Sequence, residues 1–264
     1  KFLQDNQQDG KEAYLKAISL GFSDIDIFIN YAIICEENED YYKALKYYNK
    51  ALSKDKFRAD IMLRKIEILI GMDKIEEALE NLDLFIQINP DLFEGYHLKF
   101  LILIENNRLQ EAQQILQSAM AMFPEDEGFL FDKVILFEEQ QKIQEALEIL
   151  ETVFKNNNSK IVLNEKAKIY LSQNEVQKAK NTLKQIIDLN KDEFNEDSSF
   201  YLIMIYISEN DYLNAQKYID EIIEYKNEGI YYYSALFLKG QVIKALYGQN
   251  SCKDYYENTV GILR

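Results

Sequence analysis

A small residue recurs along this chain at an almost constant interval, and that interval constrains the fold more than any other feature. The recurring residues are Gly10, Ala44, Ala78, Ala112, Ala146, Ala179 and Ala215. The first four intervals are 34 residues each, the fifth is 33 and the last is 36. Self-similarity at a period of this length indicates a repeat architecture, in which each unit contacts only its neighbours. We therefore expect an array of stacked units and no single central core.

Each unit contains two helical segments separated by a short polar turn. In the second unit we expect one helix over residues 26–37, a turn at 38–40 and a second helix over 41–53. Ala44, Tyr48 and Ala51 share one face of the second helix at helical spacing. Glycine (9) and proline (2) are scarce in the 264 residues, which favours long helices with short connections. The pattern predicts an all-α protein.

This pattern resembles the tetratricopeptide repeat. Its marks are a small residue in the second helix, a large apolar residue four positions later and a proline twelve positions after the small one, as in Ala78-Leu82-Pro90 and Ala112-Leu116-Pro124. The resemblance extends from about Gly10 to Tyr256. It implies a right-handed α-solenoid of antiparallel helix-turn-helix repeats with a period of about 34 residues.

We expect one array over residues 1–264. Its predicted parts are a partial repeat at 1–22, six repeats at 25–58, 59–92, 93–126, 127–159, 160–195 and 196–232, and a degenerate repeat at 233–264. In the partial repeat, Phe2 and Leu3 are expected to end a first helix, and residues 11–20 to form the second. The last helix keeps Tyr255, Val260, Ile262 and Leu263 apolar, so we expect the chain to continue or to pair with another copy there.

Five repeats carry a lysine where the family has a leucine, three positions after the family's tryptophan. These are Lys65, Lys99, Lys133, Lys166 and Lys239. One interpretation is that each aliphatic stem packs on a neighbouring helix while the ammonium reaches water or a carboxylate. The other is a basic ladder for an acidic ligand, which the acidity of the chain disfavours.

Composition excludes several classes of partner. A formal net charge of -15 opposes binding to a nucleic-acid backbone and to anionic membrane surfaces. No apolar stretch is long enough to span a bilayer. Cys35 and Cys252 are read as buried small apolar residues, and this usage fits a reducing, cytoplasmic compartment. Because the chain opens on Lys1 and not on methionine, export behind a removed leader stays open, and the lysine-, asparagine- and isoleucine-rich composition hints at a bacterial source.

The sequence holds no arrangement typical of an enzyme. The one histidine, His97, has no acid or cysteine arrangement around it in sequence that suggests a metal cluster or a catalytic triad. The glycines are scattered singly, so no phosphate-binding loop is formed. We therefore expect no catalytic activity, no cofactor and no metal.

The resemblance implies a concave groove lined by the first helix of each repeat. Its predicted floor comprises Ile29, Ile33, Leu63, Glu67, His97, Leu101, Phe131, Ile135, Phe200, Met204 and Phe237. Its predicted acidic rim comprises Asp26, Asp60, Glu94, Glu105, Glu138 and Asp197. Such a groove would bind a peptide or helix with apolar anchors and basic flanks. The competing interpretation is that these apolar side chains pack against adjacent repeats.

We thus predict a non-enzymatic scaffold for a protein or peptide partner. Two alternatives remain open. In the first, the chain is a regulatory or targeting segment of a larger protein. In the second, it is an assembly module that self-associates through its terminal repeats.

Overall fold

The computed structural model describes residues 2–157, 159–189, 194–225 and 228–262. All regular structure in these ranges is α-helical, which confirms the predicted fold class of an α-solenoid built from hairpins. The chain begins with α1 (Phe2–Ser19). The first helices of the hairpins are α2 (Ile25–Glu37), α4 (Ala59–Gly71), α6 (Phe93–Glu105), α8 (Gly128–Glu139), α10 (Lys160–Ser172), α12 (Glu196–Ser208) and α14 (Ile230–Tyr247). The second helices are α3 (Tyr41–Lys54), α5 (Ile75–Ile88), α7 (Leu109–Met122), α9 (Ile143–Asn157), α11 (Val176–Leu189), α13 (Tyr212–Tyr225) and α15 (Gln249–Ile262).

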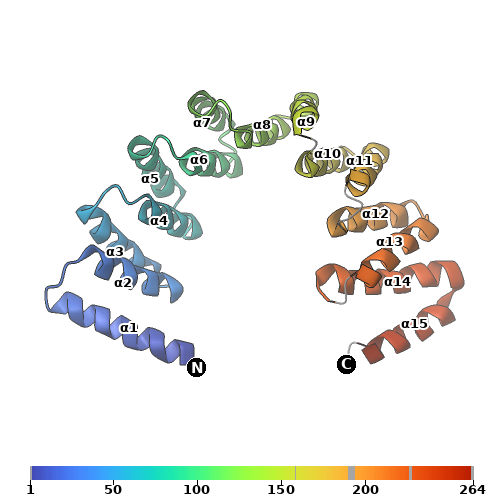
Figure 1. Cartoon of the computed structure of the whole chain (residues 1–264), viewed down its shortest axis with the longest axis horizontal. Coiled ribbons are helices and arrows are strands. Elements are labelled where there is room, and N and C mark those ends of the chain that lie inside the picture. The colour runs from blue at the N-terminus through green and yellow to red at the C-terminus, as the bar shows by residue number, and fades with distance from the viewer. Residues whose placement is uncertain (1, 158, 190–193, 226–227, 263–264) are drawn as a thin grey trace. The chain divides into compact units, whose positions relative to one another are not determined.

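The chain divides into two compact units. Unit 1 spans residues 1–141 and holds α1 to α8, and unit 2 spans residues 142–264 and holds α9 to α15. Within each unit, the second helix of one hairpin packs on the first helix of the next (Figure 1). The division falls inside the repeat predicted at residues 127–159. The single array of eight parts therefore stays a prediction.

The recurring alanines lie in the packed interior of their units. Ala44, Ala78, Ala112, Ala146, Ala179 and Ala215 are all 0% exposed. The large apolar residue four positions later, such as Leu82 or Ile219, is buried as well. A methyl group is the largest side chain that close helix approach accepts, because a larger one would push the helices apart. The sequence period therefore corresponds to a small buried residue that recurs in the packing of successive hairpins.

Each hairpin turn that precedes a recurring alanine contains one residue in the left-handed backbone region, five positions before that alanine. These residues are Glu39, Asp73, Asn107, Gln141, Asn174 and Asn210, with φ between 56° and 59°. In the first turn the amide of Asp40 donates to the carbonyl of Cys35 at 2.8 Å, and the same bond recurs at later turns. This is the Schellman arrangement, which satisfies the last carbonyls of a helix. It explains how a turn of few residues reverses the chain.

The N-terminal segment differs from the prediction. Phe2–Ser19 is one continuous helix, so the expected break after Leu3 is wrong. The intervening residues are polar and include no proline, and the single glycine there costs a helix only about 1 kcal/mol. Gly10 is half-buried, and a Cβ added there would meet Ile34 at an ordinary 3.8 Å. Gly10 is thus a poorer match to the alanine series than its spacing suggests.

The C-terminal hairpin exchanges the roles of its two helices. A Cβ on Gly240 of α14 would lie 2.1 Å from the ring of Tyr256 on α15. The small residue is therefore on the first helix and the large one on the second. Tyr256 donates to the carbonyl of Phe237 at 2.9 Å, and Tyr255 donates to that of Leu236 at 3.1 Å. Leu263 and the side chains of Val260 and Ile262 lie outside the described residues, so the apolar outer face predicted there stays a prediction.

Candidate functional site

In unit 1, the residues predicted to form the groove floor are mostly held by the neighbouring hairpins. Ile29 is only 7% exposed and belongs to the core, so its predicted place in an open groove is wrong. Ile33, Leu63, Leu101, Phe131 and Ile135 are half-buried, and all of these but Phe131 pack against the buried clusters of the unit. Glu67 is exposed. In this unit, most of the predicted floor residues therefore pack against adjacent repeats, as the competing interpretation expects.

His97 has a partner that the sequence reading missed. Its Nδ1 lies 2.9 Å from both carboxylate oxygens of Asp132, which is 1% exposed on α8. The imidazole also stacks on the ring of Phe93 with 5.1 Å between ring centroids. The hydrogen bond to Asp132 raises the pKa of His97, and partial burial opposes that rise. The contact between His97 and Asp132 links α6 to α8.

The predicted rim of unit 1 is exposed. Asp26, Asp60, Glu94 and Glu105 are exposed and Glu138 is half-buried. Asp60 is held by Arg58, whose guanidinium donates to both carboxylate oxygens at 2.9 and 2.7 Å. That pairing lowers the pKa of Asp60. The local charge of Asp60 is therefore already balanced.

In unit 2, three predicted floor residues come together in an open depression. Phe200 and Met204 on α12 and Phe237 on α14 line it, and its volume is about 500 Å³. The other lining residues are Ile230, Tyr233, Ser234 and Leu238. We call this surface the α12–α14 depression. Its lining is apolar apart from the hydroxyl groups of Tyr233 and Ser234.

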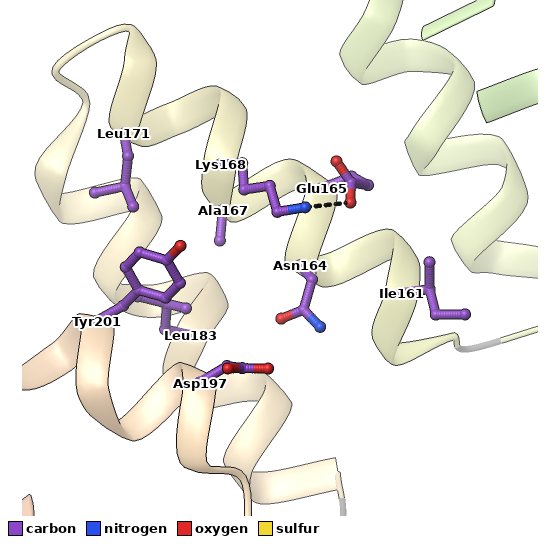
Figure 2. Close-up of a pocket in the computed structure, with 9 residues that line it drawn as sticks. All are labelled: Ile161, Asn164, Glu165, Ala167, Lys168, Leu171, Leu183, Asp197 and Tyr201. Carbon is purple, nitrogen blue, oxygen red and sulfur yellow. Dashed lines mark hydrogen bonds and ion pairs between the residues drawn. The ribbon is translucent and has the colours of Figure 1, made fainter. Parts of the chain in front are cut away.

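A second, more polar cavity lies between α10 and α12, and we call it the α10–α12 pocket. Its volume is about 250 Å³ (Figure 2). It is lined by Ile161, Asn164, Glu165, Ala167, Lys168, Leu171, Leu183, Asp197 and Tyr201. Lys168 and Glu165 pair at 2.7 Å along one wall, and the rim residue Asp197 faces them from α12 (Figure 2).

Asp197 also ties α12 to α14. The hydroxyl of Tyr231 on α14 donates to the Asp197 carboxylate, which raises the pKa of Tyr231 to about 12. The rings of Phe200 and Tyr231 lie 5.2 Å apart between centroids. These contacts place the α10–α12 pocket and the α12–α14 depression on the same run of first helices in unit 2.

The recurrent lysines are mostly satisfied within the fold. Lys99, Lys166 and Lys239 each pair with a carboxylate on the second helix of the preceding hairpin, namely Asp83, Glu151 and Asp220. The ammonium of Lys133 lies 5.6 Å from the centroid of the Phe137 ring. The structure thus agrees with stems packed on neighbouring helices and not with an open basic ladder.

Two signals in the sequence would have improved the site prediction. Asp132 lies 35 positions after His97, which is one repeat and one residue further along, so comparison across one period would have paired them. The predicted degenerate repeat begins at residue 233, whereas α14 begins at Ile230, so the prediction left Ile230 outside the last hairpin. Cys35 and Cys252 are both buried free thiols, as predicted.

The described residues contain no group of three or more histidine, cysteine, aspartate or glutamate side chains that could hold a metal ion. None of the helices in this part of the chain combines the length and apolarity needed to cross a membrane.

Stacked hairpins with a buried alanine at a fixed period define an α-solenoid. In a comparison with known protein families, family models described as tetratricopeptide repeat match residues 25–56, 103–169 and 162–193. The chain therefore contains tetratricopeptide-repeat segments. Such repeats imply a scaffold for protein–protein interaction.

Solved structures share this fold. A tetratricopeptide repeat protein from Parabacteroides merdae matches at 13% identity and a TM-score of 0.58, over 90% of this chain and 99% of that one. The C-terminal part of a repeat-containing protein from Cytophaga hutchinsonii matches at 14% identity and 0.59, over 89% and 96%. PilW, a type IV pilus biogenesis factor, matches at 18% identity and 0.56, over 80% and 98%. At these identities the likeness concerns the fold. No curated protein matches the sequence significantly.

Proposed function

We propose that unit 2 binds a peptide or helix with apolar anchors and a basic flank on its first helices. The observation that carries this proposal is where large apolar side chains are exposed. On α10, α12 and α14 they are Ile161, Tyr201, Met204, Ile230, Tyr233, Phe237 and Tyr247, which are between 43% and 77% exposed. The described residues of α2, α4, α6 and α8 include no such exposed side chain. An exposed apolar cluster of this kind is typical of an interaction surface.

The α12–α14 depression supplies the anchor site. Met204 and Phe237 hold their positions on packed helices, so a partner loses little receptor entropy on binding. Fully burying a side chain of this size stabilises a complex by about 1.5–3 kcal/mol. One or two apolar anchors from the ligand would therefore supply most of the affinity.

Asp197 supplies the site for a basic flank. Glu165 is already paired with Lys168, whereas Asp197 is exposed and accepts a hydrogen bond from a neutral group, the hydroxyl of Tyr231. A carboxylate has acceptor capacity for further donors, so a lysine or arginine of the ligand can join Tyr231 there. Such a contact on the rim speeds association more than it adds affinity.

The proposal is tested by selecting peptides from a random display library on the whole chain and measuring their affinities. We expect enriched peptides to combine aromatic or aliphatic residues with a nearby lysine or arginine. Phe237→Asp should weaken their binding about tenfold or more, equivalent to about 1.4 kcal/mol. Leu213→Asp is the matched control, because Leu213 is 69% exposed on the second helix α13 and should leave affinity unchanged.

Asp197→Asn tests the basic flank separately. It should remove the preference for lysine or arginine and reduce the salt dependence of association, while apolar anchoring persists. Equal weakening by Phe237→Asp and Leu213→Asp, or peptides enriched without apolar residues, would contradict the proposal. Sedimentation at several protein concentrations tests the alternative of self-association. A chain that stays monomeric across the concentration range would count against self-association.

A further inference from the structure

Three of the recurrent lysines form the same interaction. The ammonium of Lys166 lies 2.6 Å from a carboxylate oxygen of Glu151, and that of Lys239 lies 2.7 Å from Asp220. Lys99 pairs with Asp83 in the same way. Each lysine is on a first helix and each carboxylate is on the second helix of the preceding hairpin. The pair is thus a repeated feature of the interface between hairpins.

Lys65 and Lys133 are the members of this series without a carboxylate partner among the described residues, and of the two only Lys133 lies against an aromatic ring, that of Phe137. Asp83 lies 16 positions before Lys99, and the residue 16 positions before Lys65 is Asn49, on α3. A neutral amide replaces the carboxylate. Neither side chain makes a hydrogen bond or ion pair within the described ranges of the chain. Burial lowers the pKa of the half-buried Lys65, and the charge of Glu77 offsets part of that effect.

Asn49 and Lys65 both line a pocket between α3, α4 and α5 in unit 1. Its volume is about 150 Å³. The remainder of its wall is largely apolar and includes Leu52, Met62, Leu84 and Ile88. A cavity with a largely apolar wall and a half-buried cation, Lys65, is suited to a ligand that carries a negative charge at one end and hydrocarbon at the other.

On its α3 side, this pocket borders a segment whose charge is opposite in sign to that of the whole chain. Residues 41–58 contain six lysine or arginine residues and one acidic residue, Asp55, whereas the chain as a whole carries -15. Lys56 from this segment also lines the pocket. A local positive potential attracts anions and raises their rate of encounter.

We propose that this α3–α5 pocket binds a carboxylate carried on a short apolar chain. The ligand's carboxylate pairs with Lys65, as Asp83, Glu151 and Asp220 pair with the equivalent lysines of other hairpins. The carboxylate contacts Lys65 and accepts from Asn49, and the apolar chain lies against Leu52, Met62, Leu84 and Ile88. The carboxylate belongs either to a free short-chain acid or to an acidic residue of a peptide. This site is independent of the surface proposed on unit 2.

The first experiment titrates the whole chain with hexanoate and with the capped peptide acetyl-Leu-Glu-amide, followed by ligand-observed NMR. We expect at least one of them to bind, and the tighter of the two identifies the source of the carboxylate. Hexan-1-ol should bind at least tenfold more weakly, because it lacks the charge. Lys65→Met, which keeps the length of the stem, should weaken binding at least tenfold. Lys99→Met is the matched control and should leave it unchanged.

The second experiment supplies the missing carboxylate from within the chain. Asn49→Asp should raise the melting temperature and abolish hexanoate and peptide binding, because the new side chain pairs with Lys65. Circular dichroism establishes that each variant remains folded. The proposal is overturned if neither probe binds the natural chain, if Lys65→Met and Lys99→Met bind alike, or if Asn49→Asp changes neither stability nor binding.

Discussion

Gly95 is the residue on which close approach of neighbouring hairpins in unit 1 depends most directly. A Cβ at this position of α6 would lie 2.6 Å from the ring of Phe85 and 3.0 Å from Ile86, both on α5. Phe85 is fully buried, so its ring has no free space to enter. Glycine is therefore retained inside a helix, where it is normally unfavourable.

We expect Gly95→Ala to lower the free energy of unfolding by about 1–3 kcal/mol through overpacking, despite the better helix propensity of alanine. Gly71→Ala is the control, since a Cβ at Gly71 meets nothing within 4 Å. That change should leave stability unchanged or raise it by up to about 1 kcal/mol. Urea unfolding followed by circular dichroism measures both, and a Gly95→Ala variant as stable as the natural chain would contradict the packing argument.

The His97–Asp132 pair makes a second prediction at this scale, because the chain has one histidine. The folded-state pKa of His97 is raised above its ordinary value by the Asp132 carboxylate. Its stabilising contribution is therefore fully present below about pH 6.5, the unfolded-state pKa, and is lost as pH rises through the raised folded-state pKa. We expect the free energy of unfolding to fall across that window, and to fall less in His97→Gln.

Measuring urea unfolding between pH 6 and pH 8.5 checks this expectation. His97 is partly open to solvent, so the size of the change should be modest. An identical pH dependence in the natural chain and in His97→Gln would show that another group is responsible.

At the level of the element, the hairpin turns share one backbone conformation but differ in how well their residues suit it. The left-handed position is asparagine in three turns, at 107, 174 and 210, and aspartate in one, at 73. In the other two it is Glu39 and Gln141, whose longer side chains lack the preference for this region that asparagine and aspartate have. The left-handed conformation is therefore less favourable at Glu39 and Gln141 than at the asparagines.

Glu39→Gly should therefore stabilise the chain by about 0.5–1 kcal/mol, because glycine adopts positive φ without strain. Asn107→Gly in an equivalent turn should change stability much less, since asparagine already tolerates this conformation. Thermal unfolding of the two variants compares them directly. Equal changes in stability for the two variants would contradict the expected relief of backbone strain at Glu39. They would mean that the added flexibility of glycine in the unfolded chain dominates both changes.

At the level of the whole molecule, the two units share a fold and differ in what their first helices expose. In unit 1 the predicted floor is half-buried, and His97 is paired with Asp132. In unit 2 Met204 and Phe237 are exposed in the α12–α14 depression. The net charge of -15 is also unevenly spread, since residues 41–58 are basic. One repeated architecture therefore offers two different surfaces, an apolar one in unit 2 and an anion-attracting pocket in unit 1.

The sequence alone determined the fold class, the helical hairpin and the alanine packing, because these depend on local periodicity repeated along the chain. Each repeat contacts its neighbours, so a pattern read within one unit also describes its packing. The buried Ala112 and Leu116, for example, follow directly from their spacing.

Only the tertiary structure decided which residues are available to a partner. Ile29 and Phe237 occupy the same predicted position in their repeats, yet Ile29 is buried and Phe237 is exposed. It also decided that Lys99 is paired and Lys65 is not, and that His97 meets Asp132. Exposure and pairing depend on side chains that neighbouring helices place at the same point in space. The repeat period predicts where to look for such contacts, and packing decides which of them are made.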